Sequence, residues 1–244
     1  MILEELKNRW WKRIVENNLE LEKITIRVRG LKPEEAIGRP ARTDYPILKG
    51  REVMIQAEIS GAYGQAFTDE PSNYGGSLIS VYSLPLVSNK NRALLVAAIN
   101  ATYRYLGLVT HTRHCKDDGP EICGRKIAEH LATKLPPQTK IVMIGFQPAI
   151  AYYVSRRFRN FRVTDMDFDN IGRIKEGTLI ESYMVNKEAI LWGDVVLATG
   201  STIVNGSIEE IVNWSKGKQL IFYGMTISAA AYEFTFNQLC YESS

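Results

Sequence analysis

The fold is decided by the stretch Ile141-Val-Met-Ile-Gly-Phe-Gln-Pro148, an apolar run that ends in glycine and leads into a helix. Three similar runs follow at residues 161–165, 194–198 and 219–223, and segments with helical patterns separate them. Buried strands without apolar–polar alternation, connected by helices, are typical of a parallel sheet that is covered on both faces. We therefore predict a Rossmann-like α/β domain over residues 111–244, with a fifth strand near 238–242.

The first half of the chain has a different pattern. Residues 23–29 and 53–59 alternate apolar with polar side chains, which is typical of strands with one buried face. An amphipathic helix precedes them, a third strand is expected at 78–82, and a helix capped by Ser88 follows. These elements predict a small α+β domain with an antiparallel sheet over residues 1–110.

Composition excludes several classes of protein. The 30 Lys and Arg residues nearly balance the 27 Asp and Glu residues, and the net charge is +3, so we expect no nucleic-acid partner. The longest wholly apolar run is Ala93–Ile99, whereas a membrane span needs about 20 residues, so we expect no membrane partner. The first residues do not resemble a signal peptide. With three cysteines we expect a cytoplasmic protein with reduced thiols. A homo-oligomer remains compatible with the sequence.

Glycines and hydroxyl residues follow the ends of three predicted parallel strands. They occur in Gly145-Phe146-Gln-Pro, in Thr199-Gly200-Ser201 and at Gly224. The carboxyl ends of parallel strands meet at one edge of the sheet, where α/β proteins bind ligands. Taken singly, each glycine is better explained by a tight strand-to-helix turn. Because the three strand ends share one edge, we predict a binding site there.

The loop after the first parallel strand lacks the G-x-G-x-x-G pattern, which disfavours NAD as a cofactor. Two acids, Asp165 and Asp167, follow the next strand and are candidates for hydrogen bonds to a ligand, or for a solvated turn. Asn205 either holds its own loop or points its amide into the site. Ser207 and Glu210 have the spacing of a helix capping box.

The segment His111-Thr-Arg-His114-Cys115, followed by Cys123, carries side chains that suit zinc or a similar metal ion. The spacing matches no common metal motif, so a linker with incidental ligands is the favoured interpretation. A disulfide between Cys115 and Cys123 is a third interpretation, which a reducing compartment disfavours.

Several of these motifs resemble the putative heavy-metal chelation family, formerly a family of unknown function. They are the Gly145-Phe-Gln-Pro148 turn, the Thr199-Gly-Ser-Thr-Ile-Val-Asn205 run, the strand ending at Gly224, and Ala97-Ala-Ile-Asn100-Ala. The likeness extends over most of residues 55–230. At residues 224–228 the chain lacks prolines expected of the family.

The resemblance implies an enolase-N-terminal-like domain packed on the Rossmann-like domain, with a ligand cleft between them. It also implies chemistry on a metal-chelating or pterin-like compound, whether as an enzyme or as a binding protein. Asn100 and, as an acid or base, Glu70 are then candidates from the first domain. The alternatives are a non-catalytic metal carrier or sensor and a methyltransferase-like protein that binds S-adenosylmethionine.

The predicted cleft has Thr199 and Asn205 on one wall and part of residues 60–77, or Asn100, on the other. Helix N-termini following the strands point N–H groups toward the same place, which favours an anionic or carbonyl-bearing ligand.

Overall fold

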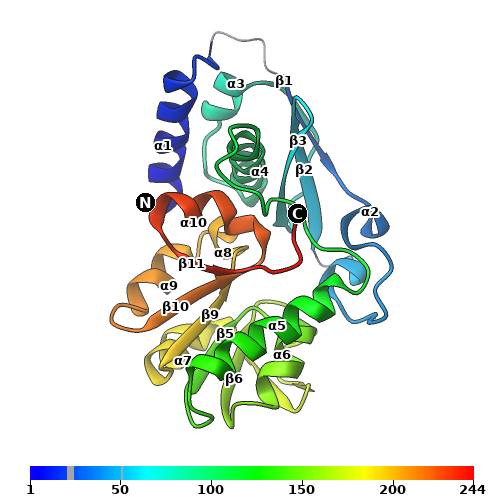
Figure 1. The fold of residues 1–244 in the computed structure, drawn as a ribbon, viewed down its shortest axis with the longest axis vertical. Coiled ribbons are helices and arrows are strands. Elements are labelled where there is room, and N and C mark those ends of the chain that lie inside the picture. Colours follow the sequence, from blue (N-terminus) through cyan, green and yellow to red (C-terminus); the bar gives the residue numbers. More distant parts are fainter. Residues whose placement is uncertain (21–24, 51) are drawn as a thin grey trace.

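Two sheets make up the structure, a computed structural model that describes residues 1–20, 25–50 and 52–244. In Figure 1 the smaller sheet lies in the upper part of the molecule and the larger sheet in the lower part. Their strand orders are β3-β2-β1-β4 and β11-β10-β9-β5-β6-β8-β7. The two sheets come from separate stretches of the chain, because the first ends at Ser77 and the second begins at Lys140.

The smaller sheet is antiparallel throughout. Its strands are β1 (Thr25–Gly30), β2 (Val53–Ile59), β3 (Ala62–Thr68) and β4 (Tyr74–Ser77). Lys23 and Ile24, which we predicted to begin the first strand, lie outside the described residues. The helices of this half are α1 (Ile2–Glu16), α2 (Pro33–Ile37), α3 (Leu78–Tyr82) and α4 (Asn89–Tyr105), with a short 3₁₀ turn, η1, at Pro46–Lys49.

The larger sheet confirms the predicted parallel strands. The predicted strands correspond to β5 (Lys140–Ile144), β6 (Asn160–Asp165), β9 (Val195–Thr199), β10 (Gln219–Tyr223) and, in part, β11 (Asn237–Leu239). A further parallel strand, β8 (Thr178–Ser182), was not predicted. Each of these strands pairs in parallel with its neighbour, and β7 (Ile174–Lys175) adds an antiparallel edge. Taken in chain order, the six parallel strands have the spatial order 3-2-1-4-5-6 of a Rossmann fold.

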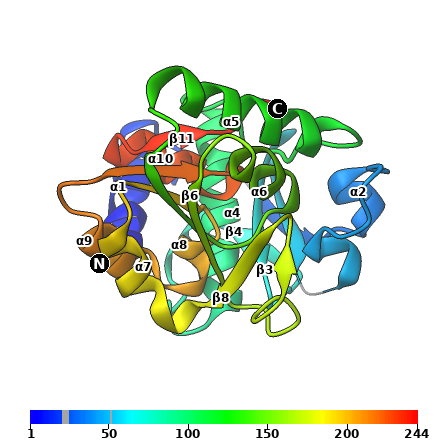
Figure 2. The same ribbon diagram turned by 90° about the horizontal axis from the view of Figure 1, so that it is seen from below.

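Helices cover both faces of this sheet. One face carries α5 (Gly119–Lys134) and α6 (Pro148–Ser155), and the other carries α7 (Asn186–Trp192), α8 (Thr202–Asn205), α9 (Ile208–Trp214) and α10 (Ser228–Phe234). Figure 2 shows the first pair and the second group on opposite sides of the strands. Within β5, Ile141 and Met143 pack toward α5 and α6, while Val142 and Ile144 join the core on the other side. This double burial explains why the strand sequences are apolar throughout.

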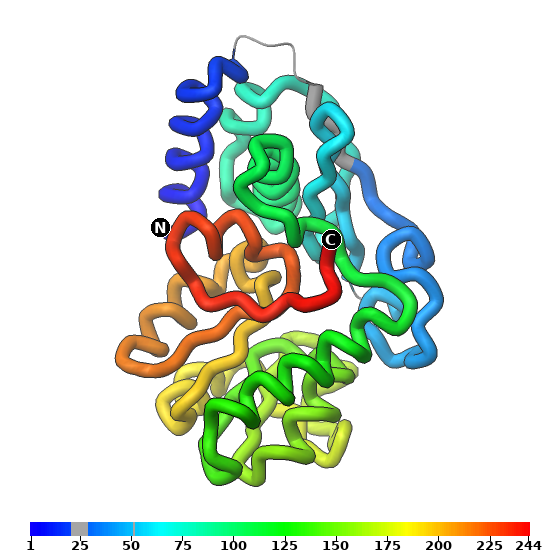
Figure 3. The backbone as a smooth tube through the Cα atoms, in the orientation of Figure 1, coloured from blue at the N-terminus to red at the C-terminus, as the bar shows by residue number. Residues whose placement is uncertain are grey.

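One hydrophobic core runs through both halves of the molecule. It contains Trp10 of α1 and Ile55 of β2 together with Val196 of β9 and Phe222 of β10. The end of the chain also crosses between the halves, because Ser244 exchanges backbone hydrogen bonds with Arg113. Figure 3 shows the C-terminus at this place, beside the segment that leads into α5. The boundary near residue 110 remains a prediction, and the two halves share their packing across it.

Two local predictions were wrong, and one element was missed. Residues 78–82 form α3 and not a strand, because the Ser77 side chain caps the helix by accepting a hydrogen bond from the Ser80 N–H. The β7–β8 hairpin was not predicted, since its exposed residues lack an apolar pattern. Ser207 caps no helix N–H with its side chain; its hydroxyl donates to Asn205 instead.

Within the part of the chain that the structure describes, no helix combines the length and apolar character needed to span a bilayer.

The backbones of β3 and α4 approach each other closely at Gly64. A Cβ atom built at this position would lie 2.1 Å from the backbone nitrogen of Ala101 and 2.4 Å from the carbonyl oxygen of Ala97. Only glycine allows the helix to pack this tightly on the strand.

Replacing Gly64 by Ala should therefore lower the free energy of unfolding by about 2–4 kcal/mol, because helix and strand must separate. Gly75→Ala is the matched control, since a Cβ atom there meets nothing within 4 Å. Urea denaturation of both variants measures the difference. Equal stability of the two variants would contradict this account of the packing.

Candidate functional site

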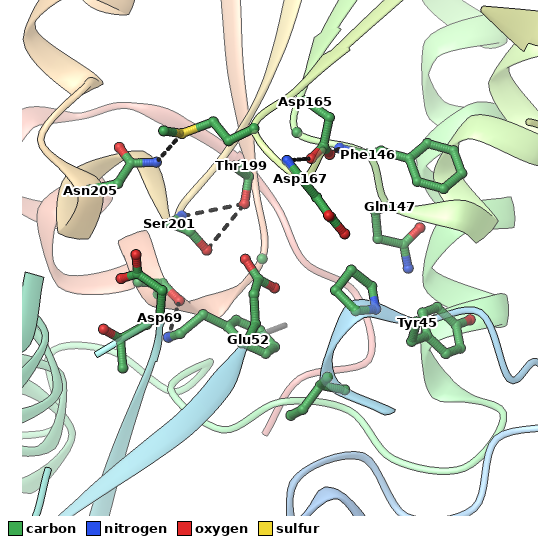
Figure 4. A pocket seen from close by; sticks show the side chains of 18 of the residues that line it. Tyr45, Glu52, Asp69, Phe146, Gln147, Asp165, Asp167, Thr199, Ser201 and Asn205 are labelled. Atoms are coloured by element: carbon green, nitrogen blue, oxygen red, sulfur yellow. Dashed lines mark hydrogen bonds between the residues drawn. The ribbon is translucent and has the colours of Figure 1, made fainter. Parts of the chain in front are cut away.

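A cavity of about 440 Å³ lies between the two sheets, at the carboxyl ends of β5, β6, β9 and β10. It spans the position between β5 and β9, where the strand order reverses and where open α/β sheets bind their ligands. Its other wall is formed by the end of β3, the residue before β2 and the 3₁₀ turn η1. Figure 4 shows the two walls facing each other, with Asp165, Asp167 and Thr199 opposite Glu52 and Asp69.

The first wall is held in place by a carboxylate. Asp165, at the end of β6, accepts hydrogen bonds from the backbone N–H groups of Phe146 (2.5 Å) and Asp167 (2.6 Å). It thereby fixes the loop after β5 to the loop after β6. In a dinucleotide-binding loop the corresponding backbone N–H groups donate to a phosphate, but here the Phe146 N–H already donates to Asp165.

Gly145 keeps the floor of the cavity open. Its φ of +87° is unfavourable for other residues, and a Cβ atom there would lie 2.8 Å from the Thr199 methyl carbon. The hydroxyl of Tyr223 donates to the carbonyl of Gly145 at 2.7 Å, which ties the ends of β5 and β10 together.

The second wall brings in two acids from the first sheet. Glu52 lies immediately before β2, and Asp69 follows β3 and accepts a hydrogen bond from the side chain of Asn89 (2.8 Å). In Figure 4 both side chains rise from this wall toward the strand ends of the larger sheet.

The cavity is strongly acidic. Its described lining contains no Lys or Arg and five acids, which are Glu52, Asp69, Asp165, Asp167 and Asp169. Burial, and then the charges of Asp165, Asp69 and Asp167, raise the pKa of Glu52 to about 7. Burial also raises the pKa of Asp165. The anionic ligand suggested by the helix N-termini does not suit this lining.

His114 offers the cavity a basic nitrogen. Its Nδ1 lies 2.6 Å from the carbonyl oxygen of Cys115, so Nδ1 carries the proton and Nε2 keeps its lone pair. Burial lowers the pKa of the imidazole to about 4, which keeps the ring neutral at physiological pH. His114 lines the cavity beside Phe67, whose ring it contacts edge-on.

Most of the predicted ligand-binding residues line this cavity. They are Gly145, Phe146, Asp165, Asp167, Thr199, Ser201, Asn205 and Gly224. Gly200 is absent from the lining and packs instead against Ile227, which a Cβ atom would approach to 2.9 Å. Glu70 also lies outside the lining; its carboxylate accepts the Lys90 N–H at the start of α4.

Asn100 lies in the core and not at the cavity. It is fully buried, donates to the carbonyls of Gln65 (3.0 Å) and Thr226 (3.1 Å), and accepts from the Ala229 N–H (3.0 Å). Both N–H groups of its amide are engaged and the side chain is fully buried, so its contacts give it a structural role.

The candidate metal ligands point in different directions. His111 contacts the Ser243 carbonyl at 3.0 Å, while His114 faces the cavity. Among the described residues, no three His, Cys, Asp or Glu side chains are arranged to hold a metal ion. The third cysteine, which we did not consider, lies near this segment: Cys240 and the backbone N–H groups that follow it lower the pKa of Cys123 to about 7.

Sequence reasoning missed Glu52, Asp69 and the cavity role of His114. Glu52 directly precedes a predicted strand, and Asp69 stands beside Glu70, which we chose instead. Nothing local in the sequence distinguishes these acids from solvated surface residues.

Comparison with known proteins finds one family model that the second half of the chain matches. This model, described as putative heavy-metal chelation, matches residues 129–237. No curated protein is similar enough in sequence to match the chain.

Two solved structures of the putative heavy-metal chelation family, both of unknown function, share the fold. The first, from Pyrococcus horikoshii, has a TM-score of 0.55 and 18% identity, and the match covers 93% of this chain and 79% of that one. The second, from Desulfitobacterium hafniense, has a TM-score of 0.53 and 12% identity, with coverage of 75% and 72%. The matched residues include the strand ends at 145, 165, 199 and 224, whereas Glu52 and Asp69 lie outside the family model.

The raised pKa of Glu52 predicts a pH-dependent stability. The unfolded carboxyl ionises near its ordinary pKa of 4.5, whereas the folded one ionises near 7, so folding becomes less favourable as pH rises between these values. Glu52→Gln should remove this loss. We expect the unfolding free energy of the variant, minus that of the wild type, to increase by about 2 kcal/mol between pH 5 and pH 8. Urea melts measure it, with Glu58→Gln, exposed on β2, as the control. If the difference in unfolding free energy between Glu52→Gln and the wild type does not change with pH, the raised pKa of Glu52 is refuted.

The structural role of Asn100 makes a separate prediction. Asn100→Ala leaves two carbonyls and one N–H group without partners in the core and should lower the unfolding free energy by about 3 kcal/mol. Thermal denaturation measures this loss. If Asn100→Ala is as stable as the wild type but binds ligand differently, the structural role of Asn100 is refuted and the residue acts in ligand binding.

Proposed function

We propose that the protein binds a small molecule in the cavity between the two sheets, and that the molecule is a metal-chelating or pterin-like compound on which it acts. The observation that carries this proposal is the position of the cavity, at the strand-order reversal of a Rossmann-like sheet and with acids from both halves of the chain on its walls.

The lining also suits a compound with a flat or compact carbon frame. Ile47 and Phe67 come from the first half and Val204 from the second, and together they give the cavity apolar surface between its polar groups. Sites for small molecules usually combine apolar walls with a few polar groups that fix orientation. The description of the family adds support for a compound of the metal-chelating kind.

The other two functions weighed from the sequence have less support. A metal carrier built on His111, His114, Cys115 and Cys123 would need these side chains to converge, and His111 and His114 face different surroundings. For S-adenosylmethionine, the loop after β5 has its Phe146 N–H already bonded to Asp165.

Asn205 provides a test with little structural cost. Its carbonyl oxygen accepts from the Ser207 N–H (3.0 Å) and hydroxyl (2.7 Å), and its amide nitrogen lies 3.5 Å from the Met166 sulfur at the cavity rim. Asn205→Ala should lower the unfolding free energy by only about 1–2 kcal/mol while abolishing ligand binding.

Native mass spectrometry of the protein as purified is the first measurement, because it detects a carried compound without knowledge of its identity. We expect added mass on the wild type and on Asn213→Ala, an exposed position on α9, and none on Asn205→Ala. An adduct retained by folded Asn205→Ala would count against the proposed position of the ligand, and outright unfolding of that variant would make Asn205 structural.

A further inference from the structure

The polar atoms of the cavity are unevenly divided between acceptors and donors. On the acceptor side, the Glu52 carboxylate receives no hydrogen bond from the residues that the structure describes. Asp69 and Asp167 each receive one, from Asn89 and from the Asp169 N–H. The Nε2 atom of His114 also keeps its lone pair, because Nδ1 carries the proton.

Most side-chain donors in the cavity are already engaged. The Tyr223 hydroxyl donates to the Gly145 carbonyl, and the Asn89 amide donates to Asp69. The Asn205 amide nitrogen is directed to the Met166 sulfur. The hydroxyls of Thr199 and Ser201 interact with each other at 3.4 Å. Among the described lining residues, the Gln147 amide, the Tyr45 phenol and the Thr68 hydroxyl are further side-chain donors, and the amides of Asn89 and Asn205 each have a second N–H group. A ligand in this cavity therefore meets acceptors and negative charge.

We propose that the ligand is an organic cation rich in N–H donors, such as an amidinium, a guanidinium or a protonated amine, with its positive end beside Glu52. This inference rests on the proposed function and names the class of molecule that the same cavity takes. An amidinium presents two parallel N–H groups, which match the two oxygens of a carboxylate.

The spacing of the acids favours an organic cation over a single metal ion. No three of the described carboxylates, imidazoles and thiols are arranged to share one ion. An organic cation carries its N–H groups several ångströms apart, so it can reach acids on both walls separately. Its carbon frame can lie along Ile47, Phe67 and Val204.

Glu52 couples this binding to pH. Without a ligand, burial and the charges of Asp165, Asp69 and Asp167 favour its protonated form up to a pKa of about 7. Of the other titratable groups on the cavity, His114 is neutral in this range and the pKa of Tyr223 is raised well above it. A cation beside Glu52 stabilises the carboxylate and displaces its proton.

Three probes of one shape test the charge preference: benzamidine, benzamide and benzoate carry a cationic, a neutral and an anionic group on the same ring. Isothermal titration calorimetry of the whole protein measures their affinities, after removal of any carried compound by dialysis. We expect benzamidine to bind at least about tenfold more tightly than benzamide, and benzoate not to bind.

Two variants and the pH locate the interaction. Glu52→Gln should weaken benzamidine binding about tenfold and leave benzamide binding unchanged. Glu58→Gln, at an exposed position on β2, should change neither affinity. Between pH 6 and pH 8 the ionised fraction of Glu52 rises about tenfold for a pKa of about 7, so wild-type affinity for benzamidine should rise by the same factor. Glu52→Gln should show no such rise. Circular dichroism confirms that each variant is folded.

The outcomes separate this inference from the proposed function. If benzoate or benzamide binds more tightly than benzamidine, the ligand is not an organic cation. The same conclusion follows if the affinity for benzamidine changes neither in Glu52→Gln nor with pH. After either result, the proposed function would still hold if native mass spectrometry found a compound on the wild type that Asn205→Ala does not carry. Failure of all three probes, together with the absence of any carried compound, would overturn both.

Discussion

The geometry of the cavity depends on one buried amide, that of Asn100. Its three hydrogen bonds join α4 to the carbonyl of Gln65 in β3, to the carbonyl of Thr226 after β10, and to the start of α10. Gln65 leads directly to the wall that carries Asp69, and Thr226 itself lines the opposite side. A buried polar group with all its partners satisfied specifies one arrangement of its neighbours, since any other arrangement leaves polar atoms unpaired. The distance between the two walls of the cavity follows from this amide and from the tight contact at Gly64.

The acids of the cavity oppose this arrangement of the two walls, because their charges repel each other. The carboxylates of five lining residues surround one space, and the protein tolerates them by two means. Asp165 is satisfied by backbone N–H groups, which also fix the loop after β5, and Glu52 retains its proton up to a pKa of about 7. Charges that oppose stability at a strand-order reversal are characteristic of sites that serve binding or catalysis.

Much of the larger sheet could be predicted because its signals are local. Apolar runs with helices between them dictate parallel strands, and parallel strands bring Gly145, Asp165 and Thr199 to one edge whatever the rest of the chain does. The opposite wall has no such rule. Glu52 and Asp69 reach the cavity through the packing of one half on the other, which depends on contacts between residues far apart in the sequence. Asn100 shows the converse difficulty, because a polar residue within an apolar helix fits either a ligand contact or a satisfied core position, and only its partners decide.

The division of the cavity between the two halves of the chain also bears on how the protein comes into being. During synthesis the acidic wall of Glu52 and Asp69 leaves the ribosome well before β9, β10 and the residues around Thr226 have been made. The first sheet therefore cannot acquire its partner wall, nor α4 the last acceptor and donor for Asn100, until the closing part of the chain has emerged. A chain that ends before Thr226 therefore lacks both part of one wall of the cavity and two of the partners that hold Asn100 in place.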